Sequence, residues 1–230
     1  MNKAWLSAQQ LTGQDPSHLV QLAGGEQLQP EAASAWKKLC QQAAAEGIKL
    51  AAVSSFRSYQ RQALIWQQKC SGIRPVLNQQ QHTLDIEQLV GWNKLEAILL
   101  YSALPGASRH HWGTELDVID LAVSPPDYQP QLLPSEYQPG GVFEQLGQWL
   151  PEHAQAAGFF LPYREYRGGV AAEPWHLSYQ SLSSRCFEQL TLDMLEQALL
   201  RQPIAEQELV LAHLPAIYQR FVQTLCEPTA

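Results

Sequence analysis

The chain has 230 residues, of which 45% are hydrophobic and 16% charged, which allows one large domain with a substantial core and excludes disorder or a fibrous repeat. Its formal net charge of −7 disfavours nucleic acids and anionic membranes as partners, because phosphate groups would be repelled. The sequence has no run of about 18 apolar residues to cross a bilayer, and polar residues interrupt the N-terminal segment where a signal peptide requires an apolar core. We therefore predict a cytoplasmic protein whose partner is small or neutral.

The N-terminal half of the chain alternates between helical and strand patterns. Its predicted helices cover 31–46, 59–70 and 84–101, and its predicted strand covers 49–54. The strand leads into the polar cluster SSFRS, which is typical of a loop at the edge of a site. Thr83 and Asp85 are alternative N-caps for the third helix.

The C-terminal half begins with a stretch rich in branched residues that predicts a central strand over 114–123. Five prolines then predict a loop over 124–140. The remaining predicted elements are a helix over 143–157, strands over 159–163 and 175–179, and helices over 187–201 and 206–225.

These elements predict an α+β fold, with a small central antiparallel sheet flanked by helices and a helical C-terminal appendage. We expect a main domain over 1–183 and a helical extension over 184–230 that packs on the same domain. The four cysteines form no CxxC pair, and structural thiols are favoured over a disulfide framework for a cytoplasmic chain of this size; they are Cys40, Cys70, Cys186 and Cys226.

Two short segments concentrate the residue types that bind metals. In SRHHWGTELD, His110 lies seven positions before Asp117, and in EPWH, Glu173 lies three positions before His176. Imidazole and carboxylate groups are the ligands of open catalytic zinc sites, where about three protein ligands leave a position for water. Two histidines and an aspartate fit this pattern, although no HExxH helix is present. Spacing alone leaves His111 as an alternative ligand.

Glu173 is the candidate proton carrier for such a site. A carboxylate beside the metal takes a proton from the attacking water and delivers it to the leaving amine. Residues three apart face opposite sides of a regular strand, so Glu173 and His176 share one site only if Pro174 bends the chain between them. The alternatives are a solvated loop carboxylate at Glu173 and a structural acid at Asp117.

Four motifs in register resemble the VanY-type D-alanyl-D-alanine carboxypeptidases, which are related to the lysostaphin and hedgehog-type zinc folds. SSFRSYQRQ is similar to the S-x-YRS-xxxQ segment of that family, and PGASRHHWGTELD to its PG-x-SxHxxGxAxD motif. AGFFLPY and EPWHLSY are similar to its GF-xx-Y and EPWH-xxY segments. Together they span 54–179, which makes chance agreement a poor explanation.

The resemblance implies one zinc ion per chain, bound by His110, Asp117 and His176, with Glu173 as general acid and base. It also implies that Arg57 stabilises the oxyanion or holds the terminal carboxylate of the substrate, for which a guanidinium is suited. The positions expected to line or brace the site are Ser108, Gln62 and Trp175, with ordinary core packing as an equal alternative for Trp175.

The chain departs from the family motifs at three places, none of which is a metal ligand. Glu115 stands where the motif has alanine, Phe56 where it has tyrosine, and Leu177–Ser178 where an arginine often follows EPWH. The segment 73–104 and the tail after Ser184 fall outside the family core. These departures bear on substrate preference rather than on the chemistry.

The family cleaves D-alanine from peptidoglycan stem peptides, so stem peptides or muropeptides are the expected partners. A cytoplasmic D,D-carboxypeptidase would destroy the pentapeptide precursor of the wall, which favours an L,D-carboxypeptidase that converts tetrapeptides to tripeptides during recycling. A D,D-carboxypeptidase is the alternative within the family. A zinc-containing module that binds muropeptides without cutting them is the alternative of another class.

Overall fold

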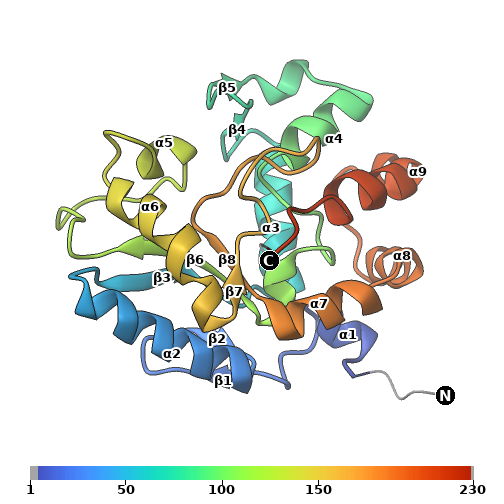
Figure 1. The fold of residues 1–230 in the computed structure, drawn as a ribbon. Helices are drawn as coiled ribbons and strands as arrows, with labels where there is room; N and C mark the ends of the chain where they lie inside the picture. The colour runs from blue at the N-terminus through green and yellow to red at the C-terminus, as the bar shows by residue number, and fades with distance from the viewer. Residues whose placement is uncertain (1–4, 229–230) are drawn as a thin grey trace.

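The computed structural model describes residues 5–228 and is built around a four-stranded antiparallel sheet (Figure 1). Its strands, in order across the sheet, are β3 (Leu50–Ser54), β6 (Glu115–Asp120), β8 (His176–Tyr179) and β7 (Phe159–Phe160). Two short hairpin pairings lie outside this sheet, β1 (Val20–Gln21) with β2 (Gln27–Leu28) and β4 (Val76–Leu77) with β5 (Thr83–Leu84). The α+β class and the central antiparallel sheet are therefore confirmed.

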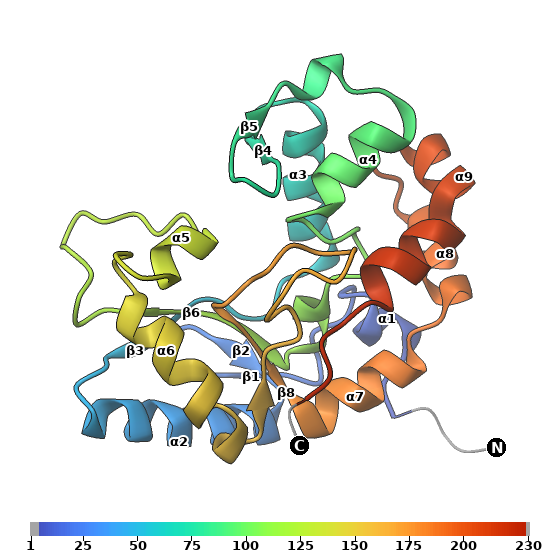
Figure 2. The same cartoon turned by 45° about the horizontal axis from the view of Figure 1, so that its top comes forward.

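Strand β6 separates the main core from the polar face of the sheet. All six of its residues are buried, and alternate residues point to opposite faces. Leu116 and Val118 join a hydrophobic cluster with α2 (Pro30–Ala45) and α6 (Glu144–His153). Glu115 and Asp117 alternate with these two residues and therefore face the opposite side of the sheet. Figure 2 shows α2 and α6 on the core side of the sheet.

The first long helix, α2, follows the pattern read from the sequence. Pro30 occupies its first turn, where a missing backbone N–H costs nothing, and Glu31 complements the positive end of the helix dipole. Its buried face includes Trp36, Leu39 and Ala43, at the three- and four-residue spacing of an amphipathic helix. The prediction over 31–46 is confirmed to within one residue at each end.

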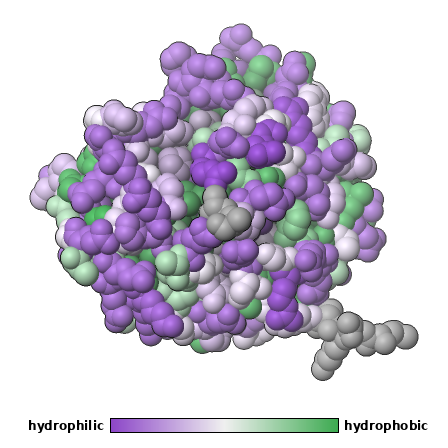
Figure 3. Space-filling model, in the orientation of Figure 1, coloured by the Kyte–Doolittle hydropathy of each residue, from purple (hydrophilic) through white to green (hydrophobic). Residues whose placement is uncertain are grey.

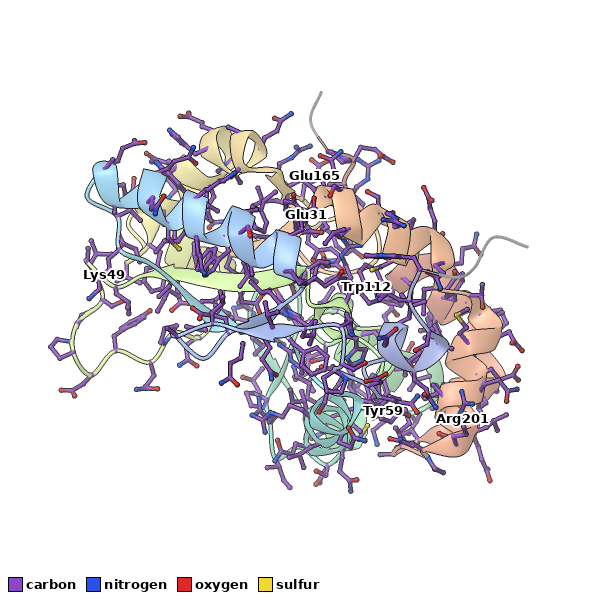
Figure 4. All side chains as sticks on the ribbon, turned by 90° about the horizontal axis from the view of Figure 1, so that it is seen from below. Glu31, Lys49, Tyr59, Trp112, Glu165 and Arg201 are labelled. Carbon is purple, nitrogen blue, oxygen red and sulfur yellow. The ribbon has the colours of Figure 1, made fainter. Side chains whose placement is uncertain are left out.

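A second hydrophobic cluster lies on the other side of the sheet. It joins α3 (Tyr59–Cys70), capped by the Ser58 hydroxyl, to α4 (Gly91–Leu99) and the C-terminal helices. The C-terminal segment also touches the start of α3, because the hydroxyl of Tyr59 donates to the carbonyl of Gln202 at 2.6 Å. Figure 4 shows Tyr59 next to Arg201, the last residue of α8.

Two predicted elements differ in the structure. The helix expected over 84–101 begins only at Gly91, whose positive φ of 58° interrupts any continuous helix before it. The preceding residues form β5 and the 3₁₀ helix η1 (Ile86–Gln88), which Asp85 caps. The loop expected over 124–140 contains the short helix α5 (Pro134–Tyr137), because proline is well tolerated in a first helical turn.

The C-terminal region has more breaks than the two predicted helices. It consists of α7 (Gln180–Gln189), α8 (Leu192–Arg201), α9 (Gln207–Ile217) and the π-helical turn η4 (Tyr218–Val222). Thr191 starts α8 by accepting a hydrogen bond from the Met194 amide, which explains why the expected helix over 187–201 is divided. Helix α7 spans the predicted boundary between 183 and 184.

The surface, the helix lengths and the cysteines of the described residues bear on the properties predicted from composition. Figure 3 shows a face that is mostly hydrophilic, with apolar side chains scattered over it. In the part of the chain that the structure covers, every helix is too short or too polar to span a bilayer. All four cysteines are free thiols, as predicted.

Candidate active site

The register of the sheet places an aspartate and a histidine on adjacent strands. Asp117 of β6 pairs directly with His176, the first residue of β8, and with Ser54, the last residue of β3. The Nδ1 of His176 lies 3.1 Å from Oδ1 of Asp117. Two predicted ligands that are far apart in sequence are thus neighbours across the sheet.

The third predicted ligand enters from the short helix η2 (Arg109–Trp112), just before β6. The Nε2 of His110 lies 3.1 Å from Oδ2 of Asp117, so the two imidazoles flank one carboxylate. Gly113 adopts the left-handed conformation, with φ 68°, and turns the chain from η2 into the strand. The helix η2, the turn at Gly113 and the strand β6 therefore place His110 and Asp117 next to each other.

These three side chains have the donor set and the spacing of a metal site. The ligand atoms of His110, Asp117 and His176 all lie within 4.8 Å of one another, and all three residues are buried. The second nitrogen of each imidazole has its own acceptor, the carbonyl of Ser55 for His110 and the carboxylate of Glu115 for His176. The inward-facing nitrogens can therefore be unprotonated, as a metal ligand must be.

The electrostatics of the metal-free cluster are strongly coupled. Burial favours a neutral Asp117, but the charges and hydrogen bonds of His110 and His176 outweigh it and lower the pKa of Asp117 well below its usual range. Burial likewise opposes a charge on His176, but hydrogen bonds to Asp117 and Glu115 raise its pKa to about 10. A metal cation in this place would take over the positive charge that the protonated imidazole supplies.

Glu173 lies beside the cluster, as the sequence predicts. Its Oε2 is 3.5 Å from Nδ1 of His176, and 14% of its side chain is exposed. The His176 amide donates to the Glu173 carbonyl at 3.1 Å, so the chain turns at Pro174 and both side chains reach one site. Burial and the charge of Asp117 raise the pKa of Glu173 to about 7, despite the opposing charges of His176, Arg57 and Lys69. A carboxyl with this pKa can both accept and release a proton near neutral pH.

Arg57 reaches the cluster from the loop between β3 and α3. One of its terminal nitrogens lies 3.7 Å from Oδ2 of Asp117. Gln62 and Ser54 each accept a hydrogen bond from the guanidinium at 2.9 Å, and Gln62 is itself anchored to the Ala103 carbonyl. The guanidinium has five N–H donors, so its held position leaves donors for an anionic group of a substrate.

The other predicted site residues occupy different surroundings. Ser108 is buried at the start of η2, where its carbonyl accepts from the His111 amide. Trp175 packs in the main core, and the centroid of its ring lies 5.5 Å from that of Tyr137. This is the core packing that the sequence offered as the alternative for Trp175. His111 is fully buried, and its Nδ1 donates to the carbonyl of Arg57 at 2.6 Å.

Sequence reasoning missed two residues that surround the cluster. The ring of Tyr163 packs edge-on against His176, with 5.2 Å between centroids. Glu115 is fully buried and accepts a hydrogen bond from Nε2 of His176 at 2.8 Å. The signal for Glu115 was present, because a residue two before Asp117 on a strand lies on the same face. Tyr163 is the last residue of the segment AGFFLPY, so the resemblance to the family's GF-xx-Y segment was the signal for it.

Comparison with known protein families agrees with this geometry. The VanY family model, described as D-alanyl-D-alanine carboxypeptidase, matches residues 25–182. The chain belongs to the VanY family. As a member of this family it is a VanY-type peptidoglycan carboxypeptidase. The matched residues include every side chain of the cluster. A Haemophilus influenzae protein described as uncharacterized is 35% identical over 121 residues, which are 52% of this chain and 92% of that protein.

Two solved structures of VanY proteins have a similar fold. VanYB in complex with D-alanine-D-alanine aligns with a TM-score of 0.52 and 22% identity, over 80% of this chain and 88% of that one. A mutant of the vancomycin-resistance D,D-pentapeptidase VanY in complex with Zn(II) aligns with a TM-score of 0.50 and 20% identity, over 84% of this chain and 88% of that one. At these identities the likeness concerns the fold.

Proposed function

We propose that this VanY-family chain is a zinc-dependent carboxypeptidase that removes the terminal D-alanine from peptidoglycan tetrapeptides. The observation that carries the proposal is the convergence of His110, Asp117 and His176 within 4.8 Å, with Glu173 3.5 Å from His176. The VanY structures that contain Zn(II) and D-alanine-D-alanine support the metal and the substrate class.

One zinc ion fits this donor set. Two imidazole nitrogens and one carboxylate oxygen are the protein ligands of many catalytic zinc sites, which keep a further position for water or substrate. When bound, zinc supplies a Lewis acid that lowers the pKa of water and polarises a carbonyl. The remaining chemistry belongs to side chains of this protein.

Glu173 is the proton carrier in this proposal. It accepts the proton of the water that attacks the scissile carbonyl, and it then delivers that proton to the nitrogen of the leaving D-alanine. The raised pKa of about 7 suits both steps, because the carboxyl changes its protonation state near neutral pH. Its partial exposure of 14% leaves it accessible from the substrate side.

Arg57 binds the terminal carboxylate of the substrate. Its guanidinium is held by Ser54 and Gln62 next to Asp117, so it presents positive charge beside the metal ligands. A guanidinium binds a carboxylate through two parallel hydrogen bonds, which selects substrates that end at the cleaved residue. This contact would make the enzyme a carboxypeptidase rather than an endopeptidase.

The choice of the tetrapeptide rests on the location predicted from the sequence. In the cytoplasm, cleavage of pentapeptides would consume the precursor of the cell wall, whereas cleavage of tetrapeptides would act on peptides returned by turnover. D,D-cleavage of pentapeptides is the second candidate, and the description of the family and the D-alanine-D-alanine complex of VanYB favour it.

The test is mass spectrometry of the purified protein incubated with murein tetrapeptide and, separately, with pentapeptide, each with and without a chelator. We expect chelator-sensitive loss of one alanine from the tetrapeptide only. Loss from the pentapeptide would assign D,D-cleavage instead. Binding of both peptides without any cleavage would identify a non-catalytic muropeptide-binding module.

A further inference from the structure

Glu115 is an acidic residue with no exposed surface, located on β6 two positions before Asp117. It stands where the VanY-type motif has alanine, so the proposed chemistry does not require it. A buried carboxylate is costly unless its charge and hydrogen-bonding capacity are fully satisfied. Its surroundings must therefore explain why the charge is tolerated.

Both oxygens of Glu115 have several partners. Oε2 accepts from Nε2 of His176 at 2.8 Å and lies 3.2 Å from Nε of Arg109. Oε1 accepts from the hydroxyls of Thr114 and Ser178, each at 2.9 Å, and a second Arg109 nitrogen lies 3.4 Å away.

Arg109 is built into the same network. Its side chain is only 5% exposed, its guanidinium lies 4.7 Å from the centre of the Trp112 ring, and it donates to the Ser178 hydroxyl at 2.6 Å. Ser178 pairs directly with Glu115 across β6 and β8. The chain departs from the family motifs at positions 115 and 178, and these two residues are therefore in contact. Arg109 donates hydrogen bonds to both of them.

The contact between Glu115 and His176 determines which nitrogen of the imidazole carries the proton. A carboxylate oxygen only accepts, so Nε2 of His176 carries the proton, and Nδ1 is left to face Asp117 and the proposed metal position. His110 is held differently, because its outer nitrogen donates to the neutral carbonyl of Ser55 at 2.7 Å. Acceptors of this kind fix the tautomer and the ring orientation of a ligand histidine and increase its basicity.

We propose that Glu115 is a positioning residue for the metal site, which holds His176 with Nδ1 toward the zinc, and that Arg109 and Ser178 hold the Glu115 side chain in place through their hydrogen bonds. The pair adds no net charge to the site, since the guanidinium balances the carboxylate. The inference rests on the proposed function only in that His110, Asp117 and His176 bind the zinc.

The experiment measures zinc affinity by competition with a fluorescent chelator, and the visible absorption of the Co²⁺-loaded protein. Glu115→Ala should weaken zinc binding about 10- to 100-fold and change the Co²⁺ spectrum, because His176 loses its acceptor. Glu115→Gln, which keeps a neutral acceptor, should restore part of the affinity. Glu136→Gln is the matched control, because Glu136 is a buried, hydrogen-bonded carboxylate in α5 and should leave both readouts unchanged.

A second variant separates positioning from folding. Glu115→Ala leaves Arg109 buried and unpaired, which can itself unfold the protein. The double variant Arg109→Met with Glu115→Ala removes both charges, and we expect it to fold and to show the same loss of zinc affinity. Wild-type affinity and an unchanged Co²⁺ spectrum in the folded double variant would overturn the proposal. If His110→Ala leaves zinc affinity unchanged, the proposed metal site itself is wrong, which is a different result.

Discussion

His111 holds the backbone of Arg57 through a hydrogen bond of 2.6 Å from its Nδ1 to the Arg57 carbonyl. Its other nitrogen accepts from the Gly106 amide at 3.1 Å, so the ring uses both nitrogens inside the protein. The Arg57 amide in turn donates to the His110 carbonyl at 3.1 Å. The two adjacent histidines therefore have different roles, because His110 faces the proposed metal position and His111 holds the loop that contains Arg57.

Replacement of His111 by alanine should destabilise the protein without removing the metal. It leaves a buried carbonyl and a buried amide without partners and opens a cavity, which together cost about 2–4 kcal/mol. Urea unfolding measures the loss, and metal analysis should still find one zinc ion per chain. His82→Ala, at an exposed position, is the control. A variant that loses zinc but keeps wild-type stability would instead make His111 a ligand.

Glu173→Ala should abolish turnover while zinc remains bound. A positioned general base contributes about 10²- to 10⁴-fold to the rate, and Glu173 is not one of the three ligands of the cluster. The measurement combines kcat on the preferred peptide with the zinc content of the same sample. Glu165→Ala, in the same loop and with a side chain 60% exposed, is the matched control. Wild-type activity in Glu173→Ala would remove the proposed proton carrier.

The sequence was sufficient to predict the elements that carry the site. The helices 31–46 and 59–70 were predictable because their start signals are standard, Pro30 in the first turn of one and the Ser58 cap of the other. The central strand was predictable from its run of branched residues. Glu173 and His176 were linked correctly through Pro174, since proline bends the chain at that point.

Other features depend on contacts that spacing does not encode. The helix expected over 84–101 fails because Gly91 takes a positive φ, which a pattern of apolar residues does not reveal. Trp175 lies next to His176 but on the opposite side of the chain, in the core with Tyr137. The direct pairing of Asp117 with His176 depends on the register of β6 and β8, which the separation of 59 residues leaves undetermined.

Arg57→Lys should raise KM more than it lowers kcat. A lysine keeps the charge but not the two parallel hydrogen bonds, and loss of a charge-assisted contact worth about 1.5–3 kcal/mol corresponds to about a 10- to 100-fold change. Arg61→Lys, at an exposed position on α3, is the control. C-terminal amidation of the peptide should abolish cleavage by the wild type. Efficient cleavage of the amidated peptide would show that Arg57 does not bind the terminal carboxylate.

Removal of the metal should stop the reaction reversibly. Dialysis against a chelator should reduce activity to background, and one equivalent of zinc should restore it, because His110, Asp117 and His176 form a single site. Asp117→Ala should resist this restoration at the same zinc concentration. Full activity in the chelated protein would exclude a metal-dependent mechanism.

The pH profile of kcat/KM should have an acidic limb set by Glu173. Burial raises the pKa of this carboxyl to about 7 in the metal-free site, and a bound zinc ion would lower it, so the limb should lie at or below about pH 7. Glu173 must be ionised to accept a proton, so kcat/KM should fall about tenfold per pH unit once the pH drops below this pKa. The positive charge of Lys69 lowers the pKa of Glu173, so Lys69→Met should move the limb to higher pH, whereas the exposed Lys37→Met should not. A limb that stays in place or moves to lower pH in Lys69→Met would contradict the assignment of Glu173.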